Sequence, residues 1–205
     1  AHVYQSAGLD EVSYREAARA VSADYANYSA HLFLAESYNV WRDPTRFNLR
    51  YETPWFSELL LANLLAPVGG TPLSPHISQQ EYSRLFAENR IGLSSTTTFR
   101  SDGQVSQLAS QYGNAGTTAW SLDLDYQHND GVRPNNDLDR IEWYTTVKQQ
   151  LSARDSVLLL AKYQDYRSGD NFQYSDPAHA RPYYRFDEFQ TPILLGGYHR
   201  EWAPG

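Results

Sequence analysis

The chain has 205 residues, a formal net charge of −7, no cysteine and 14% aromatic residues. The acidic balance and the lack of a run of Lys and Arg exclude a nonspecific nucleic-acid-binding protein, because neutralising phosphates requires clustered cations. The absence of cysteine excludes a disulfide framework and a thiol nucleophile. No apolar stretch reaches the roughly 20 residues of a membrane-spanning helix, which leaves soluble domains and barrels whose strands need about 9–11 residues.

The first predicted elements are two helices. In "VSYREAARAVSAD", Ser13 and Glu16 have the spacing of a capping box, and apolar residues follow at helical spacing. A second helix begins at about Asn27, carries Ala30 and Leu34 on one face, and stops at "RDP", residues 42–44. These two helices predict an antiparallel hairpin.

A third, very apolar helix is predicted in "TPWFSELLLANLLAPVGG". Thr53 suits its cap, Pro54 suits its first turn, and it ends before Pro67. "ISQQEYSRLFAENR" adds one or two turns that Ser78 begins.

The missing methionine and the lack of a basic or apolar leader predict that the chain is a mature or internal fragment.

The hydrophobic period then changes to two, which predicts strands. Six are expected, at about 90–100, 104–112, 117–127, 140–151, 156–166 and 192–202. Most of their connections alternate between tight turns such as "SARD" and long polar loops such as "HNDGVRPNNDLD", the pattern of outer-membrane barrels. Since six strands are too few to close a barrel, the sheet is expected to be incomplete.

Alternation gives each strand an apolar and a polar face. The predicted lipid-facing residues are Trp120, Leu122, Leu124, Tyr126, Ile141, Trp143, Leu159 and Tyr163. The predicted lumen-lining residues are Asp123, Asp125, Glu142, Lys148, Lys162, Gln164, His199 and Glu201. Charges of both signs suit a water-filled lumen. They suit the outside of a soluble sandwich equally well, so alternation leaves both folds open.

No catalytic or cofactor motif is present, so we expect no enzyme activity, no cofactor and no metal. The six His residues are scattered, and neither a phosphate-binding loop nor a nucleophile elbow occurs. Asp123 and Asp125 have a spacing that allows carboxylate chemistry, but lumen lining is the preferred interpretation. The loops "HNDG" and "NNDLD" carry oxygen ligands that suit calcium, although Asn and Asp also form turns.

Two resemblances extend this interpretation. "ARAVSADYANYSAHLFLAESY" resembles a tetratricopeptide repeat junction, with Ala20, Asp24, Ala30 and Leu34 in matching places and Tyr25 where the repeat has proline; a generic helical hairpin remains the alternative. The segments "NLRYETPWFSELLLANLLAPVGG", "RPNNDL", "VKQQLSARDSVLL" and "ILLGGYHREW" resemble a family of bacterial outer-membrane proteins in which tetratricopeptide repeats precede a C-terminal β-barrel. Exopolysaccharide-export porins share only this domain order.

The resemblance implies an α+β chain in which a tetratricopeptide-like segment precedes an antiparallel β-meander, part of an outer-membrane β-barrel. The expected domains are a helical hairpin at 1–52, connecting helices at 53–88 and the strands of an incomplete barrel at 89–205. The expected function is a porin or export channel of the bacterial outer membrane, with its helical part in the periplasm. Expected partners are outer-membrane lipid and, through the repeats, periplasmic or polysaccharide-export proteins. The alternative is a soluble secreted β-protein that binds carbohydrate through its aromatic residues.

Overall fold

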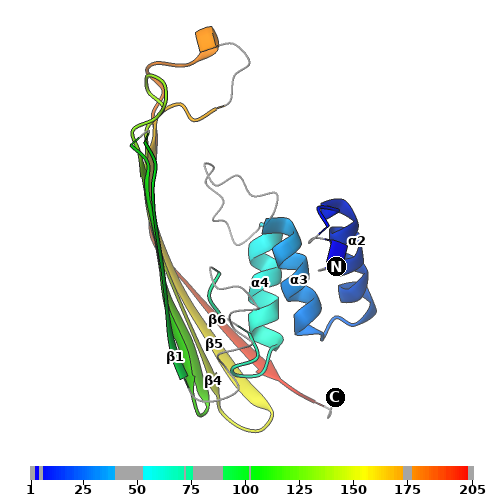
Figure 1. Cartoon of the computed structure of the whole chain (residues 1–205). Helices are drawn as coiled ribbons and strands as arrows, with labels where there is room; N and C mark the ends of the chain where they lie inside the picture. The colour runs from blue at the N-terminus through cyan, green and yellow to red at the C-terminus, as the bar shows by residue number, and fades with distance from the viewer. Residues whose placement is uncertain are drawn as a thin grey trace. The chain divides into compact units, whose positions relative to one another are not determined.

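The computed structural model describes residues 3–4, 7–39, 53–71, 73–75, 90–101, 103–172 and 177–202. The chain divides into two compact units. The first comprises Ala1–Thr71, Gln149–Leu158 and Gly197–Gly205, and the second comprises Pro72–Lys148 and Leu159–Gly196. The described α-helices therefore belong to the first unit, and most of the sheet and the short 3-10 helix η1 (Pro177–His179) belong to the second (Figure 1).

Helices α2 (Asp10–Ala23) and α3 (Tyr28–Asn39) form the predicted pair, but the predicted capping box is wrong. Helix α2 begins at Asp10, and Ser13 is a buried residue inside it, with its Oγ 3.5 Å from Ser37 Oγ of α3. Asp10 and Glu11 favour this earlier start, because acidic side chains stabilise the first turn of a helix.

The two helices share a small apolar core. Ala17 and Val21 of α2 pack with Ala30 and Leu34 of α3, and partly buried residues such as Tyr14 surround them. The predicted start of the second helix is confirmed, since the Ala30 N–H donates to Asn27 Oδ1 over 3.2 Å. Small residues at the crossing let the helices approach closely.

Helix α4 (Pro54–Leu65) begins as predicted, because Thr53 Oγ1 accepts a hydrogen bond from the Phe56 N–H and Pro54 occupies the first turn. The fully buried His31 of α3 joins α3 to α4, with Nδ1 2.5 Å from Glu58 Oε2. The predicted stop at 42–44 and the predicted turns at Ser78 lie outside the described residues.

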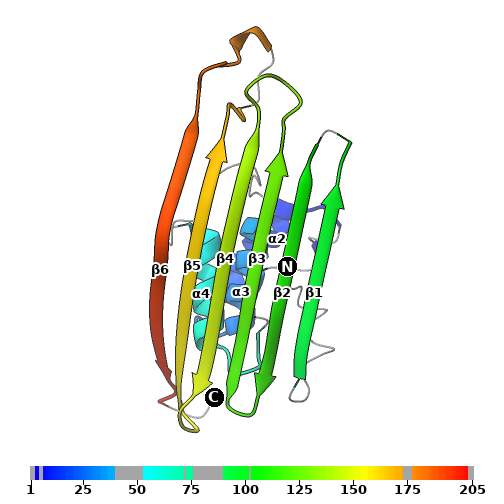
Figure 2. The same ribbon diagram turned by 90° about the vertical axis from the view of Figure 1, so that its left-hand side faces the viewer.

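The sheet is a six-stranded meander in which every strand pairs with its sequence neighbour, as predicted (Figure 2). Strand β1 pairs antiparallel with β2, and β2 pairs antiparallel with β3. The strands are β1 (Arg90–Phe99), β2 (Val105–Ala115), β3 (Thr118–Asn129), β4 (Leu138–Gln150), β5 (Asp155–Ser168) and β6 (Phe186–Arg200). The coarse α+β prediction is therefore confirmed.

The predicted start of β6 near 192 is wrong, because the strand begins at Phe186. Pro192 lies within it, which an edge strand tolerates because one side of its backbone lacks a partner. Alternation changes phase at this point, since Thr191 and Pro192 are both exposed, as at a β-bulge. The residues from Phe186 to Thr191, expected outside the strand, therefore belong to β6.

Within the first unit, α4 lies against the end of β6. A Cβ placed on Gly197 would stand 2.8 Å from Leu64 Cδ1 and 3.8 Å from Leu158 Cβ. Glycine therefore permits this close approach of helix and strand. Across the described parts of the chain, no helix is long and apolar enough to cross a membrane.

Candidate functional site

The candidate site is the face of the sheet that carries the buried charged residues, called here the buried face. It is formed by alternate residues of β3, β4 and β5, where side chains two apart in a strand point the same way. Its polar members, with Tyr144, are Ser121, Asp123, Asp125, Arg140, Glu142, Thr146, Lys148, Lys162 and Gln164. Apolar residues of the same strands, Leu138, Leu158 and Leu160, are buried on this face as well. Six of the eight predicted lumen-lining residues belong to it, and all six are buried.

Asp123 is held by two hydroxyl groups. Its Oδ1 accepts hydrogen bonds of 2.5 Å from Ser110 Oγ of β2 and from Ser74 Oγ. Ser110 is opposite Asp123 in the antiparallel register, so strand pairing alone brings these two side chains together. Sequence reasoning identified Asp123 but not its partners, because register and the position of Ser74 are tertiary information.

Asp125 and Glu142 each pair with a cation on the next strand. Arg140 Nη2 of β4 donates to Asp125 Oδ2 of β3, and each side chain is 11% exposed. Lys162 Nζ of β5 lies 2.9 Å from Glu142 Oε1 of β4, with side-chain exposures of 2% and 8%. Removing one partner of such a pair would leave an uncompensated buried charge.

Lys162 also contacts a buried aromatic ring. Its Nζ lies 5.7 Å from the centroid of the Tyr144 ring, within cation–π range. Lys148, on the same strand as Tyr144, is 1% exposed. The buried face thus contains three carboxylates, Asp123, Asp125 and Glu142, and three cations, Arg140, Lys148 and Lys162. Its formal charges balance.

Neutral polar groups complete the buried face. Gln164 Oε1 and the hydroxyls of Ser121 and Thr146 are buried and have no hydrogen-bond partner in the described part of the chain. Such groups are ordinarily satisfied by water, since leaving them dry is costly. His199 is half-buried in β6, and Glu201 is exposed just after it, so neither has the surroundings of the other predicted lumen residues.

The opposite, exposed face of the sheet is mainly apolar. Leu122, Leu124 and Tyr126 of β3 are 42%, 37% and 37% exposed, and Leu159 of β5 is 56% exposed. Ile141 and Trp143 of β4 are also exposed, whereas Trp120 and Tyr163 are partly buried. All eight predicted lipid-facing residues therefore have surface on this face.

Registers extend this exposed face to β1 and β2. Trp120 is opposite Gly113, which is opposite Ile91, so these residues share a face. Ile91, Leu93 and Phe99 of β1 are 71%, 78% and 73% exposed. Smaller and polar residues interrupt it, and the Trp120 indole N–H donates to Gln111 Oε1 over 3.2 Å.

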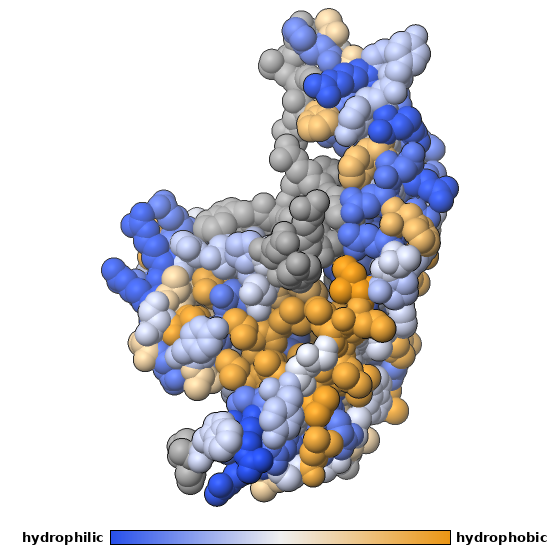
Figure 3. All heavy atoms as spheres, turned by 180° about the vertical axis from the view of Figure 1, so that it is seen from behind, coloured by the Kyte–Doolittle hydropathy of each residue, from blue (hydrophilic) through white to orange (hydrophobic). Residues whose placement is uncertain are grey.

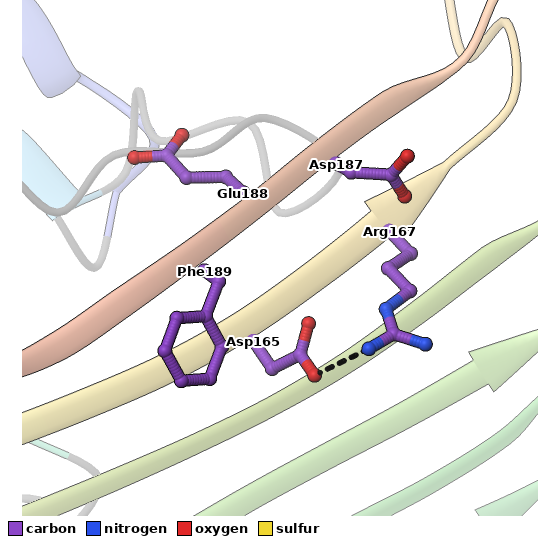
Figure 4. A pocket seen from close by; sticks show the side chains of 5 residues that line it. All are labelled: Asp165, Arg167, Asp187, Glu188 and Phe189. Carbon is purple, nitrogen blue, oxygen red and sulfur yellow. Dashed lines mark hydrogen bonds and ion pairs between the residues drawn. The ribbon is translucent and has the colours of Figure 1, made fainter.

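Aromatic and then charged residues mark the end of the exposed face nearest the long loops. The rings of Tyr163 and Phe189 meet edge to face with centroids 5.7 Å apart. Beside them is a hollow of about 380 Å³ that Asp165, Arg167, Asp187, Glu188 and Phe189 line (Figure 4). Asp165 and Arg167 form an ion pair of 3.1 Å. The upper end of Figure 3, where the long loops lie, is correspondingly mostly hydrophilic.

The long loops after β3 and β5 form a second polar cluster, which the sequence did not predict as a unit. The Asp170 N–H donates to Asn135 O over 2.5 Å, and Arg185 Nη1 lies 2.7 Å from Asp137 Oδ1. This hydrogen bond from Arg185 holds the pKa of Asp137 below its usual range, against a smaller opposing effect of burial. No group of three metal-ligating side chains occurs among the described residues.

Comparisons with known protein families, curated proteins and solved structures find no match to the chain. Its class therefore has to be inferred from the sheet and its two faces.

Proposed function

We propose that the chain is part of a bacterial outer-membrane β-barrel, a porin or export channel, whose helical segment is a periplasmic scaffold. One observation carries the proposal: the sheet has its ion pairs Asp125–Arg140 and Glu142–Lys162 on the buried face, beside apolar residues such as Leu160, whereas the middle of its exposed face is mainly apolar. A soluble sheet has the reverse arrangement, because it buries its apolar face against a core. A sheet in an outer-membrane barrel turns its apolar face outward to lipid and its polar face inward.

The ends of the exposed face support the same proposal. Aromatic rings such as Tyr126, Tyr163 and Phe189 lie toward the long-loop ends of their strands, where rings favour a membrane interface. Asp165, Arg167 and Asp187 lie closer to the loops. Beyond the interface a charged side chain no longer has the desolvation cost that it has in lipid. In this proposal they mark the outer boundary of the lipid.

The helical segment suits an aqueous compartment. Helix α2 has exposed ion pairs between Arg15 and Glu11 at 2.6 Å and between Arg19 and Glu16 at 2.8 Å. In the proposal, α2 and α3 are a repeat of tetratricopeptide type, and this repeat region contacts periplasmic or export partners. Closing a barrel requires at least about eight strands, so further strands would pair with β1 and β6.

A charge substitution on the exposed face tests the proposal. Leu159→Lys changes a residue that is 56% exposed in the structure. In water such a change is nearly neutral, whereas in lipid it costs about 2–4 kcal/mol near the midplane. We therefore expect the variant to lose binding in flotation with phospholipid vesicles and to fold less stably in them.

Leu9→Lys is the matched control, because Leu9 is 50% exposed but precedes α2 outside the sheet. It should leave vesicle binding unchanged. If the unsubstituted chain stays in the aqueous fraction as a monomer with a cooperative unfolding transition, the membrane proposal fails. The soluble, carbohydrate-binding alternative would then replace it.

A further inference from the structure

The long loops contain an arrangement that the proposed channel does not use. The loop between β3 and β4, residues 130–137, and the loop between β5 and β6, residues 169–185, lie at the same end of the sheet (Figure 1). We call their described contact residues the loop clasp: Arg133, Asn135, Asn136, Asp170, Phe172, Arg181 and Tyr184.

Main-chain groups join the two loops firmly. Asn135 Nδ2 donates to the carbonyl oxygens of Arg181 and Tyr184, both over 2.8 Å. Arg133 Nη2 donates to the carbonyl oxygens of Asp170 and Phe172 over 2.6 and 2.7 Å. Such bonds hold the described parts of the two loops together. A ligand would then lose little affinity to ordering the site.

Asp170 sets the position of an arginine and an aromatic ring. This aspartate is fully buried, and its two carboxylate oxygens accept the N–H groups of Phe172 over 3.2 Å and Arg181 over 2.7 Å. The Arg181 guanidinium carbon consequently lies 5.7 Å from the centroid of the Phe172 ring and 6.0 Å from that of Tyr184. The two rings themselves meet edge to face at 5.8 Å.

Arg181 differs from its neighbours in having no carboxylate partner among the described residues. Arg133 and Arg185 are engaged with Asp170 and Asp137. Arg181 is exposed, and its side chain makes two ring contacts and no hydrogen bond with the described residues, so its N–H groups are available on that side of the loop. A guanidinium held this way offers a planar, bidentate donor for a carboxylate or phosphate.

Exposed aromatic surface lies near this cation, since Phe172 contacts it and Tyr183 follows it two residues later in the chain. Tyr183 is 94% exposed and Phe172 is 45% exposed. A pyranose ring presents C–H groups that stack on aromatic faces, and its hydroxyl groups keep the remainder hydrated. A cation beside exposed rings therefore fits a sugar that carries an acid, better than it fits a neutral sugar or a free inorganic anion.

We propose that the loop clasp binds acidic glycans, with Arg181 contacting the carboxylate or phosphate and Tyr183 and Phe172 stacking on the sugar ring. The site does not depend on the sheet entering a membrane, because all of its contacts lie within the second unit. Asp170 acts as a positioning residue that holds Arg181 over the rings.

Titration of the whole chain in mild detergent with hexagalacturonate tests the proposal. Binding is expected, with no binding of the uncharged maltohexaose at equal concentration and none of inorganic phosphate alone. Arg181→Gln should weaken hexagalacturonate binding at least about tenfold, the effect of losing one charge-assisted bidentate contact. Arg181→Lys should restore only part of it, because lysine lacks the planar fork.

Arg154→Gln is the control, since Arg154 is an exposed arginine in the tight turn before β5. It removes the same charge without touching the loop clasp. Equal weakening by both substitutions would show nonspecific charge attraction and overturn the site. Equal binding of maltohexaose would overturn the role of the acid, and absence of hexagalacturonate binding would overturn the proposal. A folded sheet, checked by circular dichroism, accompanies each measurement.

Discussion

Single residues of the buried face contribute through pairing rather than through their charge as such. Lys162 and Glu142 are almost completely buried and lie 2.9 Å apart. Desolvating two charges offsets much of their attraction, so the intact pair adds little stability. A missing partner is far more costly, because the remaining charge stays in a poorly hydrated place.

Lys162→Met should therefore destabilise the fold by about 3–5 kcal/mol, as in other broken buried pairs. The double variant Lys162→Met with Glu142→Gln should recover most of this loss, because no uncompensated charge remains. Urea unfolding followed by tryptophan fluorescence measures both. Equal destabilisation by single and double variants would show that the pair is not coupled.

The ion pair between Asp137 and Arg185 predicts a pH dependence in the long loops. The hydrogen bond from Arg185 lowers the pKa of Asp137 in the folded chain. The ion pair therefore stabilises the fold fully above the pKa of an unfolded aspartate, about 3.9. This stabilisation is lost as the pH falls through the lower pKa that Asp137 has in the folded chain. In Arg185→Gln the carboxyl should titrate closer to its ordinary value.

Carbon-detected NMR titration of the Asp137 carboxyl measures this shift. Since the Asp137 side chain is 32% exposed, solvent screens the pair and the effect on stability should be small. Arg154→Gln is again the control and should leave the Asp137 titration unchanged. An unchanged titration in Arg185→Gln would contradict the assignment.

Among the secondary-structure elements, β6 offers a direct comparison between the two faces of the sheet. Gly196 and Gly197 are adjacent, so their side-chain positions point to opposite faces. A Cβ at Gly197 would stand 2.8 Å from Leu64 Cδ1, whereas a Cβ at Gly196 would have only Leu159 Cδ2 within reach, at 3.8 Å.

Gly197→Leu should therefore destabilise the fold by about 1–3 kcal/mol through overpacking against α4. Gly196→Leu should be neutral in buffer or detergent and favourable in lipid, where an added apolar side chain is solvated by acyl chains. Thermal unfolding of both variants, in detergent and in vesicles, makes the comparison. Equal effects of the two substitutions would contradict the packing of α4 on β6.

At the scale of the whole molecule, the described sheet ends in two edge strands, β1 and β6. Edge strands present unpaired backbone groups, which are incompatible with lipid and promote association in water. We therefore expect residues 1–205 alone to aggregate in plain buffer and to require detergent. Light scattering coupled to gel filtration measures this, and a stable monomer in buffer would contradict it.

Periodicity predicted much of this architecture, because helices and strands impose different spacings on apolar residues. The change from helices to strands lies near residue 90, and alternation placed Asp123 and Lys162 on the face that proves to be buried. The partners of these residues were not predictable, since pairing depends on register. The hydrogen bond between Ser110 and Asp123 is an example, because it joins two strands. The register of these strands depends on the turn between them and on the burial of their faces, and neither can be read from one strand alone.

The loops and β6 were harder to predict for a different reason. Asn135 and Asp170 have the composition of ordinary turn residues, and only the folded chain shows that they connect two loops. Likewise, the sixth strand was expected to begin at 192, whereas it begins at Phe186 and includes Pro192, because an edge position makes proline acceptable. Rules based on local sequence fail at such places, because the position of a residue in the folded chain removes the energetic cost that the rule assumes.

Pro192 also affects how another strand can pair with the edge strand β6. A proline has no N–H, and a bulge bends its strand, so Pro192 and the phase change beside it interrupt the regular backbone of β6. Two copies of the chain that meet along β6 therefore cannot form a continuous ladder of backbone hydrogen bonds over its full length. Association along β6 should therefore be irregular rather than a continuous extension of the sheet, whereas a partner strand matched to the irregularity could add in one alignment.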